Sequence, residues 1–326
     1  MKVKPKFSKE ILRIDDVEAT VKNICTRLRE DISGGMKRKG GIVGISGGID
    51  SSVTLALAVR ALGARNVKGL MLPEKDSSSD SLTFAKTLAE KFGVVYEIED
   101  ISGALDGFGC YARRDEAVKN VFPEYNPIEY KFKIGITPNT LNQNLPAVFH
   151  ATIVDSEGNE TSKRLPLKEY LQIVAASNFK QRSRMSMLYY HAEKMHYAVI
   201  GTPNKHEVEQ GFFVKHGDGA ADVMPIAHLF KTQVYQLAEY LEIPQEIIKR
   251  PPTTDTYSAE QTQEEFFFQL PFRQMDLLWY AFENDYGPEE VGEVMEMSAK
   301  DVIGIFNGFT RKIKTTDYLR MSPIKY

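Results

Sequence analysis

The sequence predicts an α/β protein with an open, mostly parallel sheet and helices on both faces, built as a single domain over residues 1–326. Three observations predict this fold. Short β-branched runs alternate with helix-like runs, which is typical of parallel strands joined by crossover helices. A turn rich in glycine and serine, SGGIDSS, follows the first strand-like run. The chain has 42% hydrophobic and 26% charged residues, ordinary values for a globular protein.

The elements of this sheet are predicted in order along the chain. Residues 9–32 carry apolar side chains at helical spacing, which indicates an amphipathic helix. The runs GGIVGIS, VKGLMLP and VVYEIEDI are predicted strands, and VTLALAVRAL and SLTFAKTLAEKFG are the helices between them. Further along, YAVIGT predicts another strand and KTQVYQLAEYL another helix.

Residues 108–165 break the alternation. They contain YKFKIGITPN, VFHATIVDSEGNETSKRLP and several prolines. The stretch DSEGNE is typical of a hairpin turn between two strands. We therefore interpret 108–165 as a β-rich insertion in the α/β domain.

Composition and charge exclude several classes of protein. The net charge is −3, from 41 basic and 44 acidic residues, so no general affinity for nucleic acid is expected. No run of 18 apolar residues exists for a membrane span, and the start of the chain lacks the apolar core of a signal peptide. Cys25 and Cys110 are the only cysteines, which argues against a disulfide scaffold or a structural zinc site. A cytoplasmic protein is expected.

The turn between the first strand and its helix is the first candidate site. It comprises Gly44, Ile45, Ser46, Gly47, Gly48, Ile49, Asp50 and Ser51. Backbone N–H groups at a helix start attract anions, and glycine lets phosphate oxygens approach closely. An aspartate beside phosphates implies a bridging divalent cation, as Mg²⁺ provides. The plainer alternative is a capped helix start, with Asp50 or Ser51 as the cap.

The motif itself narrows the chemistry. It is neither a Walker loop nor GxGxxG. SGGxDS after a strand resembles the ATP pyrophosphatase (PP-loop) group, whose members cleave ATP between the α and β phosphates. The resemblance implies an adenylated intermediate and leaves the acceptor open.

Downstream motifs resemble those of the ammonia-dependent NAD synthetases. Five blocks stand in that family's order: N-x-K-x-R-x-R-M at 178–185, G-T-x-x-x-x-E at 201–207, G-[FY]-x-x-K-x-G-D-G-x-x-D at 211–222, P-[IL]-x-x-L-x-K-x-Q at 225–233 and P-T-x-D at 252–255. The resemblance covers roughly 20–105 and 170–280. It implies an adenine nucleotide alpha hydrolase-like fold.

The resemblance also implies a role for each matching residue. Residues 46–51 would bind the ATP phosphates, Asp50 and Glu207 would hold Mg²⁺, and Thr202, Lys231 and Thr253 would contact ATP. Arg182, Lys215 and Asp222 would contact the dinucleotide acid, with Arg311 and Lys312 as the nearest equivalents of a tail pair that reaches it. Asp50, Lys231 and Glu207 would carry catalysis.

Elementary electrostatics agrees with part of this allocation. Lysine is a mobile point charge suited to phosphates that become pyrophosphate. Lys231 starts a predicted helix, where a cation opposes the helix dipole, so an anionic partner is expected. His206, between a lysine and a glutamate, is expected at the surface.

The sequence departs from the family's pattern in two places. Where the family has an Asp-Glu pair in a loop, this chain has Gln263, Glu264 and Glu265. The insertion lies just before the predicted helix of Arg182, which in the family contributes to the dimer interface. A glutamine-hydrolysing domain is not recognised, so ammonia is the expected nitrogen donor, unless a separate amidotransferase supplies it.

The resemblance thus predicts a homodimeric ligase that converts deamido-NAD and ammonia to NAD through an acyl-adenylate, releasing AMP and pyrophosphate. One alternative is a sibling ammonia-dependent amide ligase that acts on a different carboxylic acid. A PP-loop enzyme that modifies tRNA is disfavoured because neither a basic face nor sulfur-handling cysteines are visible. A non-catalytic nucleotide-binding module would not need the metal ligands.

Overall fold

The structure is a computed structural model that describes residues 4–136, 148–253, 256–259, 261–263 and 267–326. Asp255, Glu264 and Glu265, which the motif analysis singled out, lie outside the described residues. The strands are β1 (Gly41–Gly44), β2 (Val67–Met71), β3 (Val95–Ile98), β4 (Lys131–Ile136), β5 (Phe149–Val154), β6 (Glu160–Arg164) and β7 (Ala198–Ile200).

Helices cover most of the remaining chain. The first half contains α1 (Val17–Arg29), a π-helix η1 (Glu30–Gly35), α2 (Ile49–Leu62), a 3-10 turn η2 (Ala64–Asn66), α3 (Ser79–Lys91), α4 (Ser102–Gly107) and α5 (Cys110–Val121). The second half contains α6 (Leu167–Met195), α7 (Lys205–Gln210), α8 (Lys231–Tyr240), α9 (Gln245–Ile248), α10 (Phe272–Glu283), α11 (Pro288–Met295) and α12 (Ala299–Arg320).

The predicted parallel sheet is confirmed. Its strand order is β3-β2-β1-β7, and every pair is parallel. β1 pairs with β2 on one side and with β7 on the other, so the loop after β1 lies at the middle of the sheet's carboxyl edge. Ligands of open α/β sheets bind at such an edge.

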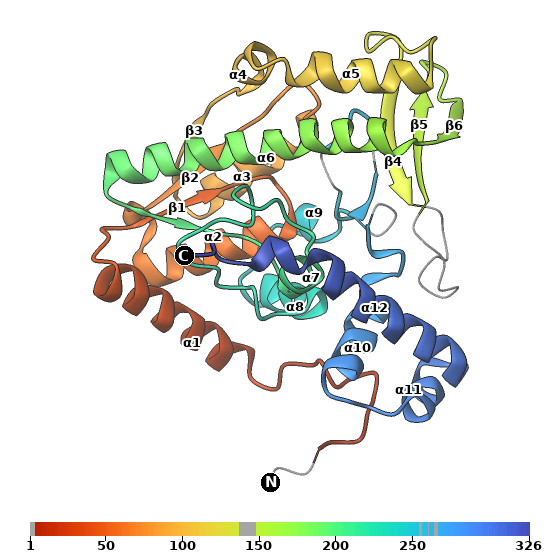
Figure 1. Cartoon of the computed structure of the whole chain (residues 1–326). Coiled ribbons are helices and arrows are strands. Elements are labelled where there is room, and N and C mark those ends of the chain that lie inside the picture. Colours follow the sequence, from red (N-terminus) through yellow and green to blue (C-terminus); the bar gives the residue numbers. More distant parts are fainter. Residues whose placement is uncertain (1–3, 137–147, 254–255, 260, 264–266) are drawn as a thin grey trace.

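Helices pack on both faces of this sheet, as predicted (Figure 1). Successive side chains of a strand point to opposite faces. Ile42 of β1 therefore packs toward Met185 and Leu188 of the long helix α6. Val43, the next residue, joins the larger core formed with α1, α2 and α8.

The first helix is shorter than the periodicity of residues 9–32 predicted. It begins at Val17, because Asp16 caps it by accepting a hydrogen bond from the Ala19 amide at 2.8 Å. Leu12, counted in that periodicity, packs instead in a separate core with α10, α11 and α12. Apolar spacing alone does not show whether a residue such as Leu12 lies in the first helix or packs in this separate core.

The segment 108–165 contains the predicted hairpin and also a helix. β4, β5 and β6 form an antiparallel sheet, and the turn from β5 to β6 is held by Asp155, whose Oδ1 accepts from the Asn159 amide at 2.9 Å. α5 precedes this sheet and packs with it and with α6 around Phe122 and Phe132. The prediction of a β-rich segment at 108–165 missed α5, because charged residues interrupt the apolar pattern of its buried face.

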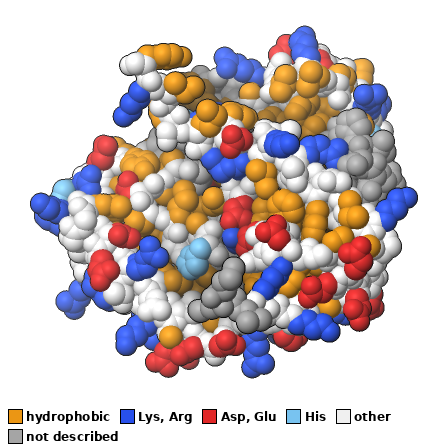
Figure 2. Space-filling view, turned by 60° about the horizontal axis from the view of Figure 1, so that its bottom comes forward, with side chains coloured by type: hydrophobic (Ala, Val, Ile, Leu, Met, Phe, Trp, Pro, Cys, Tyr) orange, Lys and Arg blue, Asp and Glu red, His pale blue; other side chains and the backbone are white. Residues whose placement is uncertain are grey.

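Among the described residues, none of the helices is both long enough and apolar enough to span a membrane. Figure 2 shows acidic, basic and apolar side chains interspersed over one face of the molecule. That mixture agrees with the near-balanced charge of the sequence.

Candidate active site

The loop after β1, predicted to bind phosphate, is a tight turn held by its own hydrogen bonds. Gly47 has φ +76°, and a Cβ there would lie 2.4 Å from the Ser81 carbonyl oxygen, so only glycine fits. The Ser46 and Ser51 hydroxyls are 3.1 Å apart, and Ser51 also donates to the Gly48 carbonyl at 3.0 Å. Gly48, not a side chain, caps α2. The plainer alternative of an Asp50 or Ser51 cap is therefore wrong, which leaves both side chains available for other contacts.

Asp50 and Lys231 form an ion pair below this loop. Lys231 Nζ donates to Asp50 Oδ2, and the lysine side chain is fully buried. Asp50 Oδ1 also accepts from Asn204 Nδ2 at 3.2 Å. The expectation that Lys231 has an anionic partner is confirmed.

Glu207 lies beside this pair. Asn204 caps α7 and forms a capping box with Glu207, whose Oε2 accepts from the Asn204 amide at 2.8 Å. Burial first, and then the negative charge of Asp50, raise the pKa of Glu207 to about 8, although Lys231 opposes the shift. Two carboxyl groups and one ammonium thus meet at one point, and a cation bound there would offset the repulsion between the two carboxylates once Glu207 loses its proton.

A cavity of about 570 Å³ opens above these groups. The predicted ATP- and metal-binding residues that line it are Gly44, Ile45, Ser46, Gly48, Ile49, Asp50, Ser51, Thr202, Glu207 and Thr253. Lys231 lies just beneath the lining, paired to Asp50. The cavity volume is in the range of small-molecule sites. The structure therefore brings together residues that the sequence spreads from 44 to 253.

Residues predicted to contact the dinucleotide acid have other partners in this structure. Arg182 Nε donates to the Lys215 carbonyl at 3.1 Å. Lys215 Nζ donates to the carbonyls of Tyr318 and Met321, at 2.9 and 2.8 Å, at the end of α12. Because Tyr318 lines the cavity, Lys215 positions the wall of the cavity.

The remaining predicted substrate residues, Asp222, Arg311 and Lys312, do not line the cavity. Asp222 is exposed and accepts from the Val199 amide at 2.7 Å and the Tyr189 hydroxyl at 3.3 Å. Arg311 is half-buried on α12. Lys312 donates to Gln210 and to a backbone carbonyl, and removal from water lowers its pKa to about 7.

Two residues near the cavity, Asn204 and Lys180, make contacts that were not expected from the sequence. Asn204 connects Asp50 to the start of α7, and the spacing of Asn204 and Glu207 is a capping-box pattern that could have revealed it. Lys180 is buried, and its Nζ donates to Glu74 at 3.0 Å, to Asp76 and to the Thr256 carbonyl. This cluster holds the chain after β2, which lines the cavity.

The expectation of a surface position for His206 is wrong. Its ring is fully buried, and Nε2 lies 2.5 Å from Asp276 Oδ1 on α10. Asp276 also accepts from the Thr232 amide at the start of α8, at 2.7 Å. His206 thus connects α7, α8 and α10 behind the Glu207 carboxylate, a contact that its charged sequence neighbours concealed.

The fold and this cavity define a nucleotide-binding α/β protein with a glycine loop at the carboxyl edge of its sheet. Comparison with known families is more specific. The model of the family described as NAD synthase matches residues 20–124 and 141–323. The chain belongs to the NAD synthase family. The match omits 125–140, which fall within the segment 108–165.

Similar proteins share this family over nearly their whole length. A protein of Rhizobium meliloti (strain 1021) named NH(3)-dependent NAD(+) synthetase is 47% identical over 97% of this chain and 94% of its own. One of Mesorhizobium japonicum with the same name is 46% identical over 95% of this chain and 96% of its own. The Thermotoga maritima protein of that name is 34% identical over 80% of this chain and 89% of its own.

Solved structures agree on the fold. NMN synthetase from Francisella tularensis has a TM-score of 0.66 at 21% identity, covering 96% of this chain and 99% of its own. The NH3-dependent NAD synthetase from Campylobacter jejuni has a TM-score of 0.63 at 21% identity, covering 96% of this chain and 100% of its own.

Proposed function

We propose that this chain joins ammonia to the carboxylate of deamido-NAD, using ATP and forming NAD, AMP and pyrophosphate. The observation that carries the proposal is the glycine loop with Asp50, Glu207 and Lys231 around one cavity, in a chain closely similar to NH(3)-dependent NAD(+) synthetases. ATP is a substrate of this reaction.

The first step activates the acid. A carboxylate oxygen of the substrate attacks the α-phosphorus of ATP, the bond from that phosphorus to the bridging oxygen breaks, and pyrophosphate departs. The glycine loop receives phosphate oxygens, and its close backbone leaves room for them. Lys231 is placed to neutralise the charge on the departing pyrophosphate once ATP competes with Asp50 for the ammonium.

The second step forms the amide. Ammonia attacks the carbonyl carbon of the acyl-adenylate, loses a proton, and AMP departs. No enzyme nucleophile is needed. Cys25 and Cys110 are both buried, and burial raises the pKa of each thiol, so neither is suited to hydrolyse glutamine. Ammonia, free or delivered by a separate amidotransferase, is therefore the proposed donor.

The site fits Mg²⁺, the cation proposed for it. Asp50 and Glu207 would hold the ion, because two neighbouring carboxylates, once Glu207 has lost its proton, suit a hard cation that keeps several waters. When bound, Mg²⁺ would neutralise part of the triphosphate charge. Asn204 keeps both carboxylates in place through its side chain and its amide.

The proposed organisation is a single domain with the segment 108–165 as an insertion, acting as a homodimer. Exposed apolar side chains at the start of α6 support a partner surface there, since Leu167 and Leu171 are 70% and 55% exposed. Light scattering of the purified protein tests this, and a monomer at micromolar concentration would contradict it.

The activity is tested by incubating the purified chain with ATP, Mg²⁺, ammonium and deamido-NAD, and quantifying NAD and AMP. Equal amounts of both are expected. Nicotinic acid mononucleotide is the control acid, chosen because a similar fold belongs to an NMN synthetase. If AMP forms only with the control acid, that acid and not deamido-NAD is the substrate, which would favour the sibling ligase. AMP formed with neither acid would contradict the proposal.

A further inference from the structure

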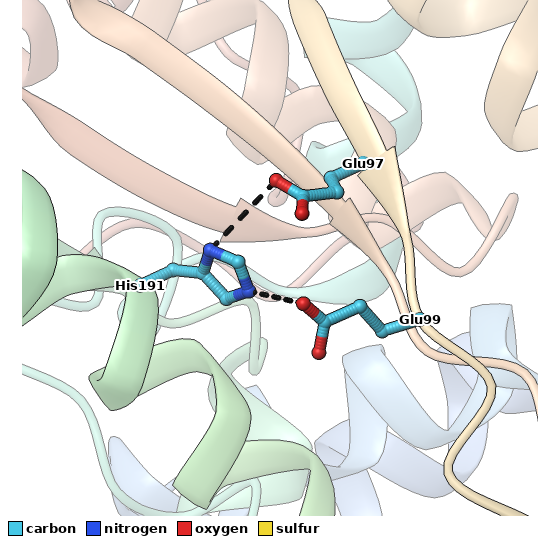
Figure 3. A group of neighbouring side chains, drawn as sticks. All are labelled: Glu97, Glu99 and His191. Carbon is cyan, nitrogen blue, oxygen red and sulfur yellow. Dashed lines mark hydrogen bonds and ion pairs between the residues drawn. The ribbon is translucent and has the colours of Figure 1, made fainter.

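A second group of candidate ligands lies where the edge strand β3 meets α6. Glu97 lies on β3 and Glu99 one residue past its end, and the two point toward His191 of α6 (Figure 3). One carboxylate or imidazole atom from each of the three lies within 4.8 Å of the others. None of the three lines the active-site cavity.

The His191 ring is only partly satisfied. Its side chain is 1% exposed, and its Nε2 lies 2.7 Å from Glu99 Oε1. Because a carboxylate can only accept, Nε2 carries the proton of this bond. The other ring nitrogen, Nδ1, is buried without a hydrogen-bond partner and lies 3.9 Å from Glu97 Oε2.

Neither protonation state of the His191 ring gives Nδ1 a hydrogen-bond partner. If Nδ1 also carries a proton, the ring is an imidazolium attracted by Glu99 and Glu97, but Glu97 at 3.9 Å is too far to accept a hydrogen bond from this buried donor. If Nδ1 has a free lone pair, that pair faces the negative charge of Glu97. A cation between Nδ1 and Glu97 would resolve the second state, because it accepts both the lone pair and the carboxylate.

We propose that His191 Nδ1 and Glu97 bind a divalent transition-metal ion, of which Zn²⁺ is the probe, and that Glu99 orients the imidazole. Metal-bound histidines commonly donate their second N–H to a carboxylate, which fixes the ring and its tautomer. The Glu99 contact has this form. An imidazole ligand favours zinc, nickel or cobalt over Mg²⁺, which prefers oxygen. Water completes the coordination.

The spacing is close to that of an occupied site. With metal–ligand bonds of about 2.1 Å and tetrahedral angles, the two ligand atoms would be about 3.4 Å apart. Their separation here is 3.9 Å. Glu97 has a side chain that is 43% exposed, so it is free to move inward by the difference. The bound ion would tie the edge of the sheet to α6, the helix that carries Lys180 and Arg182.

Lys68 is the competitor for this site. Its ammonium, 15% exposed, hydrogen-bonds to Glu97, and Lys194 adds positive charge nearby. A metal ion must displace Lys68 from Glu97. Removal of the Lys68 ammonium is therefore expected to strengthen metal binding, whereas removal of the Glu97 carboxylate is expected to weaken it.

The experiment is a Zn²⁺ titration of the full chain against a chromophoric zinc indicator, in excess Mg²⁺ to occupy oxygen-only sites. One zinc per chain is expected, and Glu97→Gln is expected to weaken it by about tenfold or more. Lys68→Met should tighten binding several-fold, while the exposed control Glu293→Gln should leave it unchanged. Co²⁺ should give an absorption spectrum of nitrogen and oxygen ligation in the wild type.

Two results would overturn the proposal. One is the absence of stoichiometric zinc binding at a free Zn²⁺ concentration of about 1 mM, because the dissociation constant of any site would then be weaker than millimolar. The other is binding that Glu97→Gln leaves intact and Asp50→Asn removes, because the ion would then occupy the active site. Circular dichroism of Glu97→Gln must match the wild type, and that half-exposed position makes the variant a safer test than replacing buried His191.

Discussion

Replacement of Lys180 by methionine tests whether the buried charge cluster after β2 stabilises the site. The ammonium is 2% exposed and donates to Glu74 at 3.0 Å, to Asp76 at 2.5 Å and to the Thr256 carbonyl at 3.1 Å. Glu74 is fully buried, so the substitution leaves its charge without its main partner. The chain that carries both acids borders the cavity, and its position depends on these contacts.

The expected loss of stability is large. Removing one member of a buried ion pair costs about 3–5 kcal/mol, because the remaining charge stays out of water. Here Arg114 still binds Asp76, and Arg184 lies 4.0 Å from Glu74, so the lower end, about 3 kcal/mol, is expected. Adding Glu74→Gln removes the stranded charge, and the double variant should recover about 1–3 kcal/mol relative to the sum of the singles.

The assay is equilibrium unfolding in urea, followed by circular dichroism, with Lys22→Met as the matched control. Lys22 is exposed on α1, so the same substitution there should change the unfolding free energy by less than about 0.5 kcal/mol. A Lys180→Met variant as stable as Lys22→Met, or simple additivity of the two substitutions in the cluster, would show that this ion pair does not stabilise the site.

Three further predictions concern the cavity itself. Asp50→Asn should lower turnover by about 10²–10³-fold while the chain stays folded, since Glu207 can still balance Lys231; ammonium-dependent AMP formation and circular dichroism check this. The pKa of Glu207 is raised to about 8, so below that pH a proton must leave before a cation binds, and Mg²⁺ affinity should fall by up to about tenfold per pH unit. Glu207→Gln should remove this slope in a Mg²⁺ titration between pH 6 and 9, and an unchanged slope would contradict the assignment. Gly47→Ala places a Cβ 2.4 Å from the Ser81 carbonyl at a φ of +76°, and should raise the KM for ATP and lower stability by about 1–3 kcal/mol; normal values for both would show that the loop is less constrained than it is here.

The sequence by itself determined the sheet and the loop. β-branched runs alternating with helical runs specified β1, β2, β3 and β7, because strand and helix periodicities are local properties of the chain. The glycines and serines of residues 44–51 specified a tight turn between β1 and α2 for the same reason, and its predicted role in anion binding stays a prediction. Five ordered motifs specified the family, which the NAD synthase match confirms.

Only the tertiary structure decided which of those residues meet. Lys231 pairs with Asp50 across 181 positions of sequence, and buried His206 with Asp276 across 70. A charged residue has no local pattern that reveals its partner, since the pairing depends on how α7, α8 and α10 pack behind the loop. Arg182 and Lys215 were predicted from their motifs, but their contacts with each other and with the end of α12 follow from packing alone.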